Sequence, residues 1–497
     1  MLFRIMVRPN NAQVVGLDRA KGSDMPRFWC SAGVFAVALS STVAAQDTRT
    51  VVEPKIPPFC MTLAAQLTSI NDGKYNTLAA ADESKLDTER IQKAIDGCGK
   101  GKAVALQPRG AANAFLSGPL ELREGVTLVV DKGATLFETI DPKVMETSPG
   151  SCGVVNTAPG RGCRPLISVS HVSGAGVMGD GAIDGRGGVK LLGKDVSAWQ
   201  LAQQAEAGGG QKVSRLIVAD HADNFTLYRI TLKNSPNFHV SYNAGDGFTV
   251  WGVKIDTPHR FPSSPDPLAR NTDGIDPGGG SKNITITHSY LREGDDNVAI
   301  KGGAGGLTDM TVSHNHFYWG HGMSIGSETN GGVSRVRVFD LSLDGTDSGI
   351  RIKSTGTRGG LVHDIVYDDV CIRDSGRPLD ITAAYNANGP VKGDSPPTFR
   401  DITLHNVRIS GGGRILFDGY DHDHRAQVLL DGVYITDAAT PPIPYMYTFD
   451  NADVIYGPGG SNLQMPAGTD ATVTGKSSAG KPDSCADKFV PFPPGQQ

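Results

Sequence analysis

Four short polar motifs follow one another in the second half of the chain, and their residue types could carry out acid–base chemistry. The motifs are Asn-Thr-Asp-Gly at 271–274, Gly-Asp-Asp-Asn at 294–297, Gly-His-Gly at 320–322 and Arg-Ile-Lys at 351–353. Together they supply three carboxylates (Asp273, Asp295 and Asp296), one imidazole and two cations. Such a set could hydrolyse a glycosidic bond in a polymer whose sugars carry carboxylates.

The three aspartates suggest how a proton could be kept available. Inverting hydrolysis needs one protonated and one ionised carboxyl group flanking the bond, with room for a water molecule. Clustered aspartates repel one another when ionised, so at least one pKa is expected to rise. A guanidinium can hold a carboxylate with two hydrogen bonds, whereas an ammonium acts as a point charge. Spacing alone does not decide which aspartate holds the proton.

The elements that must position these residues are short strands in a repeating array. From Asp273 to Asp295 is 22 residues, and the next intervals, to His321 and to Arg351, are 26 and 30. Apolar, β-branched stretches run in step with the motifs, with steps of 26, 26, 28 and 37 between the central residues Thr285, Thr311, Arg337, Ile365 and Ile402. A drifting period with Gly, Asn and Asp between short strands predicts an all-β protein of the parallel β-helix type.

Stacked coils make residues one period apart into neighbours, roughly 4.7–4.9 Å apart along the axis. Asp273, the Asp295–Asp296 pair, His321 and Arg351 are therefore expected to form a ladder on one face. Because alternate residues of a strand point the same way, Arg351 and Lys353 should project together into that face while the residue between them points into the core. The surface predicted is a site for an anionic sugar.

Each motif also has a plainer interpretation. Any one of the aspartates could cap a coil turn, and His321 could be a satisfied structural histidine. The Arg351–Lys353 pair alone would be an ordinary solvated strand face, and Asn271 could bond a turn or touch the substrate. The occurrence of all four motifs in order argues against these interpretations taken together.

The motifs resemble those of the polygalacturonase family of glycoside hydrolases (family 28). The local sequences at 271–277, 294–301 and 320–329 are most similar to the secreted endopolygalacturonases of plant-rotting bacteria. The resemblance extends from about residue 55 to residue 455, and it includes the segment Asn-Ser-Pro-Asn-Phe-His at 234–239, one coil before the first motif. One departure from the fungal and plant pattern is Asn297, where those enzymes usually carry Cys. It suits the bacterial branch.

The resemblance implies a right-handed parallel β-helix that hydrolyses α-1,4-galacturonosidic bonds of polygalacturonate or pectin with inversion. It implies that Asp295 donates a proton to the leaving oxygen and that Asp273 and Asp296 activate water. His321 would support the protonation state of the acid. Substrate-binding positions carried over are Arg351, Lys353, Asn271, Tyr385 and His239. No cofactor and no metal is expected, and the likeness favours endo over exo action, which the sequence alone leaves open.

Two other function classes share the fold. A pectate lyase acts on the same polymer by elimination, but it needs calcium-binding carboxylates and an arginine base, which the Asp-Asp and Gly-His-Gly motifs do not resemble. A non-catalytic β-helix such as an adhesin or a tailspike could keep the architecture. It would have no reason to keep three aspartates, a histidine and an Arg-Lys pair in register.

The N-terminus predicts secretion into the extracellular space. Met25-Pro26-Arg27 precedes an apolar run from 28 to 39 and then small residues, so we expect a signal peptide cleaved after Ala45. The run is too short for a membrane span, and Met25 could be the true start. Residues 1–45 carry five basic and two acidic side chains, so their removal makes the net charge of −5 more negative. Nucleic acid is therefore an unsuitable partner, and a monomer without membrane attachment is expected.

Cysteine use agrees with an oxidising compartment. Six of the seven cysteines follow residue 45. Proximity favours the pair Cys152–Cys163, with Cys60–Cys98 and Cys371–Cys485 as further pairings among those allowed. None of the pairs has the spacing of a zinc site.

Four regions are expected along the chain: a signal region (1–45), a lead-in and cap (46–102), a catalytic β-helix (103–440) and a C-terminal cap or tail (441–497). Residues 87–95 predict a short amphipathic helix, capped by Asp87, that closes the first end of the solenoid. The stretch 193–213 is expected to form an inserted helix or loop at the edge of the cleft.

Overall fold

The structure is a computed structural model that describes residues 46–72, 75–206, 209–258, 269–386, 391–437, 443–466 and 470–493. The chain from Ala45 to Gln497 forms one compact unit. The expected signal peptide, its cleavage after Ala45 and the alternative start at Met25 fall outside the described residues.

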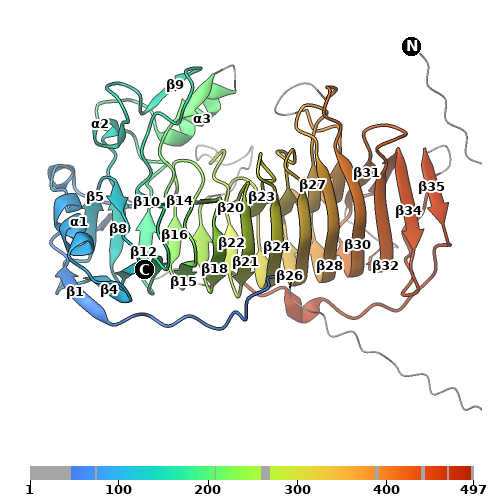
Figure 1. The fold of residues 1–497 in the computed structure, drawn as a ribbon, viewed down its shortest axis with the longest axis horizontal. Helices are drawn as coiled ribbons and strands as arrows, with labels where there is room; N and C mark the ends of the chain where they lie inside the picture. Colours follow the sequence, from blue (N-terminus) through green and yellow to red (C-terminus); the bar gives the residue numbers. More distant parts are fainter. Residues whose placement is uncertain are drawn as a thin grey trace, which may run out of the picture. The chain divides into compact units, whose positions relative to one another are not determined.

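The unit is a right-handed parallel β-helix (Figure 1). Most of its described strands belong to two long parallel sheets, which we call the site sheet and the outer sheet. The site sheet has 11 strands: β6 (Leu120–Glu121), β10 (Ile167–Ser170), β14 (Ile217–Asp220), β17 (Val240–Asn243), β20 (Ile275–Pro277), β23 (Val298–Ile300), β25 (Met323–Ile325), β27 (Ser348–Lys353), β29 (Arg377–Thr382), β31 (Gly413–Asp418) and β33 (Tyr445–Asp450).

The outer sheet has 20 strands and bends around the rest of each coil. They are β1 (Phe59–Ala64), β4 (Lys102–Gln107), β5 (Ala114–Ser117), β7 (Val126–Val130), β8 (Thr135–Glu138), β11 (Gly176–Met178), β12 (Ala182–Asp184), β15 (Phe225–Tyr228), β16 (Thr231–Lys233), β18 (Asp246–Trp251), β19 (Lys254–Asp256), β21 (Ser281–Thr287), β22 (Tyr290–Arg292), β24 (Leu307–Phe317), β26 (Val333–Asp344), β28 (Leu361–Arg373), β30 (Thr398–Ser410), β32 (Ala426–Ile435), β34 (Ala452–Tyr456) and β35 (Ala471–Thr474).

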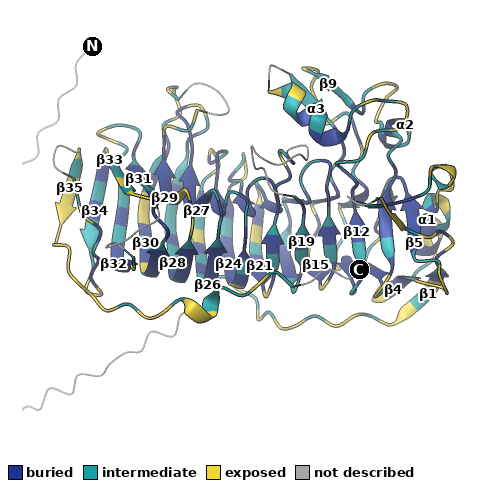
Figure 2. Cartoon of the chain, turned by 180° about the vertical axis from the view of Figure 1, so that it is seen from behind, coloured by how far each residue is buried: buried dark blue, intermediate teal, exposed yellow. Residues whose placement is uncertain are grey.

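The register of the paired strands in the outer sheet aligns the apolar side chains of the core. Ile284 pairs with Met310, which pairs with Val336, and the row continues through Ile365, Ile402 and Val428. All six side chains are buried, so the interior is a continuous apolar stack (Figure 2). The expected alignment of Arg337 with Ile365 was wrong by one residue, because Arg337 pairs with Val366. The lengthened coil between them shifts the register.

The outer sheet turns its corner at a row of residues with left-handed backbone. In successive coils the bend falls at His288, His314, Asp340, Asp369 and Asn406, with φ between 50° and 56°. The strand pairing puts these positions side by side. Asn, Asp and His tolerate positive φ better than other residues with a Cβ, so they can occupy these five bends, while glycine takes the bend at Gly252 and Gly432 in the flanking coils.

The paired strands extend on both sides of the expected range 103–440. β1 pairs with β4 in parallel, and β33, β34 and β35 continue the two sheets beyond residue 440. The end strands β1 and β35 carry exposed residues, as Figure 2 shows in yellow. The solenoid is therefore longer than the sequence pattern indicated.

In the described parts of the chain, three helices lie outside the sheets: α1 (Thr88–Asp96), α2 (Pro142–Met145) and α3 (Ala198–Ala205). α1 buries Ile91, Ala94 and Ile95 at the first end of the solenoid, as expected. The expected capping role of the Asp87 side chain was wrong, because Asp87 accepts hydrogen bonds from Arg90 and from the backbone of Leu116 instead. Its carboxylate joins the helix to the sheet.

Shorter elements complete the fold. The described residues include 3-10 turns at Ala80–Asp82 (η1) and Ala486–Lys488 (η2). Two small antiparallel ladders pair β2 (Ile70–Asn71) with β3 (Asn76–Thr77), and β9 (Val154–Asn156) with β13 (Gly210–Lys212). The second ladder and α3 form an insertion above the site sheet, in the region where an inserted element was expected (Figure 1). Among the described helices, none is long and apolar enough to cross a membrane.

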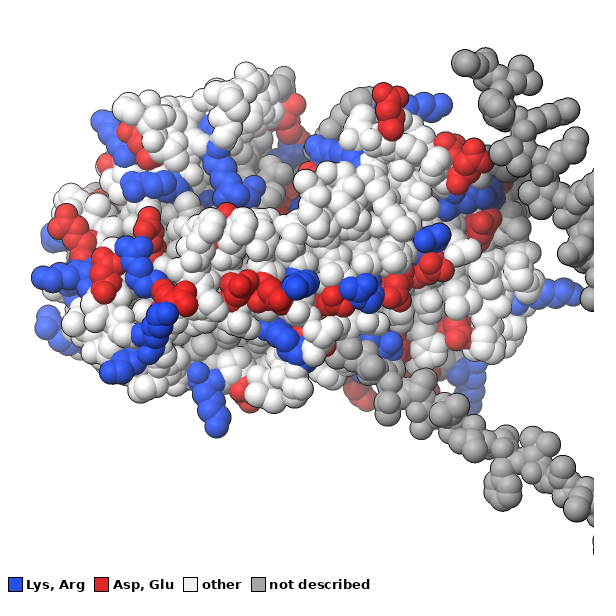
Figure 3. Space-filling model, in the orientation of Figure 1, with Lys and Arg blue, Asp and Glu red and all other residues white. Residues whose placement is uncertain are grey.

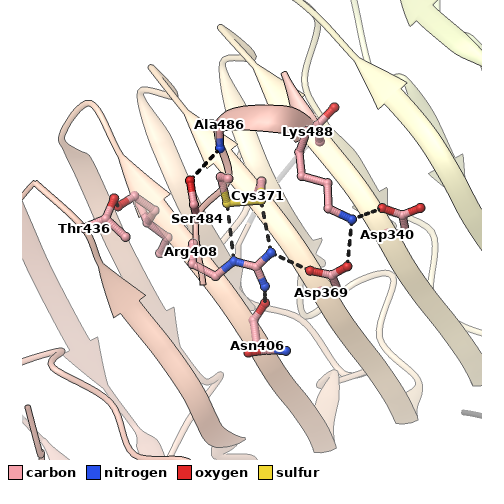
Figure 4. Close-up of a disulfide and its surroundings, with 12 residues drawn as sticks. Asp340, Asp369, Cys371, Asn406, Arg408, Thr436, Ser484, Ala486 and Lys488 are labelled. Carbon is pink, nitrogen blue, oxygen red and sulfur yellow. Dashed lines mark hydrogen bonds and ion pairs between the residues drawn. A yellow bond between two sulfur atoms is a disulfide. The ribbon is translucent and has the colours of Figure 1, made fainter. Parts of the chain in front are cut away.

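The C-terminal tail folds back onto the outer sheet and is fixed by a disulfide. Cys485 bonds to Cys371 on β28, and Arg408 donates to Asp369 beside them (Figure 4). Lys488 Nζ lies 2.9 Å from Asp369 Oδ2 and also contacts Asp340. The other two bonds in the described part of the chain join Cys60 to Cys98 and Cys152 to Cys163, so the pair favoured by proximity and the two further pairings are all present.

Candidate active site

The acidic residues and the histidine lie just before paired strands of the site sheet. Ile275 of β20 pairs with Val298 of β23, and Val298 pairs with Met323 of β25. Asp273, Asp296 and His321 each precede one of these residues by two positions, so they occupy equivalent levels on three successive coils. The expected ladder is present for these three residues.

Arg351 takes a different place in this arrangement. Met323 pairs with Ile350, so Arg351 lies beside Ser324 and Asp380 rather than at the level of His321. Ile352 is fully buried, while Arg351 and Lys353 both reach Asp296. The two cations therefore project together, as their alternation on the strand predicted, but Arg351 lies three residues beyond the position that is level with His321.

Asp295 is held by several hydrogen bonds. His321 Nδ1 lies 3.1 Å from Asp295 Oδ1, and the other ring nitrogen lies 3.1 Å from Asp347 Oδ2. The backbone amide of Asn271 donates to Asp295 Oδ2 at 3.2 Å, and that of Asp296 donates to Asp295 Oδ1 at 3.0 Å. This carboxylate is more exposed than those of Asp273 and Asp296, with 19% of its side chain accessible.

Asp296 is buried between two cations. Lys353 Nζ donates to its Oδ2 at 2.7 Å and Arg351 Nη1 donates to its Oδ1 at 3.2 Å. Arg351 is shared with Asp380, at 3.3 Å. The ring of Tyr385 covers both cations, with its centroid 5.4 Å from Arg351 Cζ and 5.2 Å from Lys353 Nζ. Tyr385 thus belongs to the same assembly.

Asp273 has a looser setting, in which Lys301 Nζ lies 3.7 Å from its Oδ2. Behind it, His239 is fully buried. The His239 Nδ1 lies 3.1 Å from the carbonyl oxygen of Asp273, and its Nε2 lies 2.8 Å from Thr257 Oγ1. The expected substrate contact of His239 therefore does not fit its position, because both ring nitrogens are engaged inside the protein. His239 supports the backbone of Asp273.

The charges of the site give the carboxylates different pKa values. Burial, followed by the charges of Asp276 and Asp295, raises the pKa of Asp273 well above its usual range. Burial also raises the pKa of Asp295, but the charge and hydrogen bond of His321 outweigh it, so this pKa lies below the ordinary value. Lys353 and Arg351 overcome burial in the same way at Asp296, whose pKa is lowered.

The histidine is charged at neutral pH. Burial lowers the pKa of His321, but Asp295 and Asp347 outweigh it and raise the pKa to about 9. In the free protein, the proton most readily held by the three aspartates is therefore on Asp273, while Asp295 forms an ion pair with His321. Ligand atoms of Asp295, Asp296 and His321 lie within 4.8 Å of one another, but a doubly protonated imidazole has no lone pair for a metal.

A cleft of about 800 Å³ passes over these residues and is visible as a hollow in the upper outline of Figure 3. Asp273, Asp295, Asp296, His321 and Lys353 line it, together with Asn271 and Tyr385. Arg351 is buried behind Asp296 and is not part of the lining. Its first contacts are with carboxylates of the protein rather than with the cleft.

Sequence reasoning missed several lining residues: Phe238, Arg270, Lys301, Ser327, Glu328 and Arg358. Lys301 had a detectable signal, because Ile300-Lys301 repeats the Ile352-Lys353 pattern at the same strand position two coils earlier. Arg358 donates to Glu328 at 2.7 Å from a turn, where the repeat pattern gives no guide to side-chain direction. The insertion contributes Ala202, Ala205 and Glu206 to one wall.

Comparisons with known proteins agree with this geometry. The family model for glycosyl hydrolases family 28 matches residues 113–448. An endo-polygalacturonase of Pectobacterium carotovorum subsp. carotovorum is 42% identical over 81% of this chain and 92% of that protein. A polygalacturonase of Ralstonia nicotianae is 36% identical over 93% of this chain and 95% of the relative.

Solved structures of polygalacturonases also resemble this chain. The polygalacturonase from Erwinia carotovora ssp. carotovora matches with a TM-score of 0.72 and 40% identity, over 82% of this chain and 99% of that one. An exopolygalacturonase from Thermotoga maritima matches with a TM-score of 0.59 over 86% of this chain and 94% of the other. At 19% identity the second likeness concerns the fold alone.

Proposed function

The chain belongs to family 28 of the glycosyl hydrolases, and from this premise we propose that it hydrolyses α-1,4-galacturonosidic bonds of polygalacturonate with inversion, cutting within the polymer. The observation that carries the proposal is the Asp295–Asp296 pair at the base of the cleft, held between His321 on one side and Lys353 on the other. The 42% identity to a relative named endo-polygalacturonase supports internal cleavage.

Asp295 acts as the proton donor in this proposal, although its pKa is low in the free protein. The role of proton donor and the low pKa are compatible if an anionic sugar, when it binds, changes the charges around Asp295. A galacturonate carboxylate beside Lys353 partly cancels one of the cations that lower the pKa of Asp295, and the sugar ring displaces water from the cleft. Both effects raise the pKa. Binding of the correct substrate thereby loads the acid with its proton.

Asp273 and Asp296 orient and deprotonate the attacking water. Asp296 is suited to accept a proton because Lys353 and Arg351 hold it ionised. Asp273 is raised in pKa, and Lys301 at 3.7 Å is the cation available to stabilise its ionised form. Inversion requires acid and base on opposite faces of the bond with water between them.

The cations of the cleft support an acidic substrate. Lys301, Lys353, Arg270 and Arg358 line it, so local attraction can overcome the negative net charge of the whole chain. We further propose that the protein is secreted and works as a monomer, needing neither a membrane nor nucleic acid. The six cysteines paired in three disulfides support the oxidising compartment.

Digestion of polygalacturonate in the presence of EDTA tests the proposal. Hydrolysis releases reducing ends without absorbance from unsaturated uronides, and chelation leaves the rate unchanged. A lyase would produce that absorbance and fail without calcium, while a binding protein would release nothing. Product profiles on a long oligogalacturonide distinguish internal cleavage, which gives mixed lengths at first, from exo action, which gives monomer or dimer from the start.

A further inference from the structure

A second, smaller cavity adjoins the catalytic cleft on its N-terminal side. It has a volume of about 250 Å³, and Gln211, Phe238 and Asn271 line both this cavity and the cleft. Its remaining lining comes from the Cys152–Cys163 loop and from the residues around β13, β14 and β17. The shared wall makes it a continuation of the path that a polymer in the cleft would follow.

Arg215 forms one side of this cavity without a carboxylate partner. Its Nε donates to Asn237 Oδ1 at 3.2 Å, and its Nη1 donates to Ser241 Oγ at 3.1 Å. The guanidinium lies 4.1 Å from the centroid of the Phe238 ring, which holds it flat. Among the described residues, no carboxylate lies within ion-pairing distance of it.

Arg161 faces the same space from the disulfide loop. It forms no ion pair with any described carboxylate. The two cations repel each other. Burial first and then the charge of Arg161 lower the pKa of Arg215 to about 10, against the more distant charges of Asp276, Asp273 and Glu328, which raise it. Two guanidinium groups that repel each other beside a cavity are an arrangement that a bound anion would stabilise.

Gln211 gives independent support. This residue of β13 lines both cavities, yet neither its Nε2 nor its Oε1 has a hydrogen-bond partner among the described residues, although both atoms are buried. An unpartnered buried amide costs roughly 1–3 kcal/mol. A sugar with hydroxyl groups, unlike a simple inorganic anion, would satisfy both its donor and its acceptor.

We propose that Arg161, Arg215 and Gln211 form an additional subsite that binds the carboxylate of a galacturonate unit farther along the polymer from the bond being cleaved. The subsite rests on the proposed function. Strand register places Arg215 level with Phe238 and Asp273, two coils before Asp273, which is about 10 Å along the axis. Lys353 lies on the opposite side of the acidic residues, so cationic sites flank the reaction centre on both sides.

The test compares the variants R215Q and R161A with the wild type on polygalacturonate and on end-labelled oligogalacturonides of increasing length. R215Q should lower kcat/KM on long substrates by about 10-fold or more, as expected for a lost charge-assisted contact. R161A should cause a smaller loss, because Arg161 is exposed to solvent. Oligomers too short to reach the subsite should be cleaved at wild-type rates, and the preferred bond in longer ones should shift.

A matched control is R164A, on the same loop. Arg164 donates to the backbone of Val144 and does not line the cavity, so its cleavage pattern should stay that of the wild type. If R215Q fails to fold, the exposed R161A carries the test alone. Unchanged cleavage positions and KM in folded variants would overturn the subsite while leaving the proposed function intact. A wild type that does not hydrolyse polygalacturonate would overturn both.

Discussion

At the residue scale, Asp295 is placed to transfer a proton, because it is the most exposed of the three aspartates and makes the contact with His321. Replacing it by Asn keeps the shape but removes the transferable proton. We expect D295N to lose about 10²–10⁴-fold in kcat, with substrate binding and unfolding temperature nearly unchanged. More than a tenth of the wild-type rate in steady-state assays would remove Asp295 from the role of acid.

Lys353 has two tasks, binding substrate and keeping Asp296 ionised. K353M should lower kcat/KM by roughly 10- to 150-fold and reduce the preference for unesterified over methylated pectin. Because Lys353 lowers the pKa of Asp296, its loss should raise that pKa and move the acidic limb of the pH–rate profile to higher pH. K102A, at an exposed site on β4, is a control.

An acidic limb that stays in place in K353M would show that Asp296 is not the group that titrates there. Equal losses on methylated and free substrates would indicate that Lys353 serves the structure of the site and not the recognition of the carboxylate.

His321 should shape the alkaline limb. Its pKa is raised to about 9 through Asp295 and Asp347, against the effect of burial, and loss of its proton removes a positive charge from beside the acid. H321A should lower the rate and displace the alkaline limb, because this titration no longer occurs. The limbs belong to the coupled cluster rather than to one residue. If the alkaline limb of the profile of kcat/KM against pH does not move in H321A, His321 serves packing and does not support the acid.

The same shift affects stability. A histidine whose pKa is higher in the folded than in the unfolded protein stabilises the fold fully below its unfolded pKa of about 6.5. The contribution is lost as pH rises through about 9. The difference in unfolding temperature between wild type and H321Q should therefore be largest in mild acid and shrink in alkali. A difference that grows with pH would contradict a protonated His321.

At the element scale, α3 depends on its first turn. Ser197 accepts a hydrogen bond from the backbone of Gln200, whose side chain accepts in return from the backbone of Ser197. S197A should reduce the free energy of unfolding by about 1 kcal/mol, and S197T should retain most of it. Because α3 supplies Ala202 and Ala205 to the cleft, S197A should also raise KM. An unchanged denaturation midpoint would show that the cap is dispensable.

At the scale of the whole molecule, the tail is fixed to the solenoid by the bond between Cys371 and Cys485, which are 114 residues apart. Closing a loop of that length restricts the unfolded chain strongly, so C371S/C485S should cost about 2–5 kcal/mol in denaturant unfolding. C152S/C163S removes a bond across only 11 residues and should cost less in chain entropy. A larger loss from the short loop would mean that native contacts, not loop closure, dominate.

The sequence by itself determined the repeat, the strands and the identity of the acidic ladder. The intervals of 23 residues from Asp273 to Asp296 and of 25 from Asp296 to His321 are each close to one coil, so these residues could be placed on neighbouring coils without a structure. Alternation along a strand also fixed the shared direction of Arg351 and Lys353. Proximity in the sequence favoured Cys152–Cys163, which are 11 residues apart, but it does not explain the bond between Cys371 and Cys485, which forms because the C-terminal tail folds back onto the outer sheet (Figure 4).

Only the tertiary structure showed which groups each side chain contacts. Coil lengths change where turns carry insertions, and for that reason the alignment slipped by one residue after Arg337. Spacing also does not show that His239 is buried under Asp273 or that Arg351 faces Asp296 and Asp380. The second cavity with Arg215 joins an inserted ladder to the solenoid. Such contacts depend on the packing of segments that share no period, so no repeat in the sequence records them.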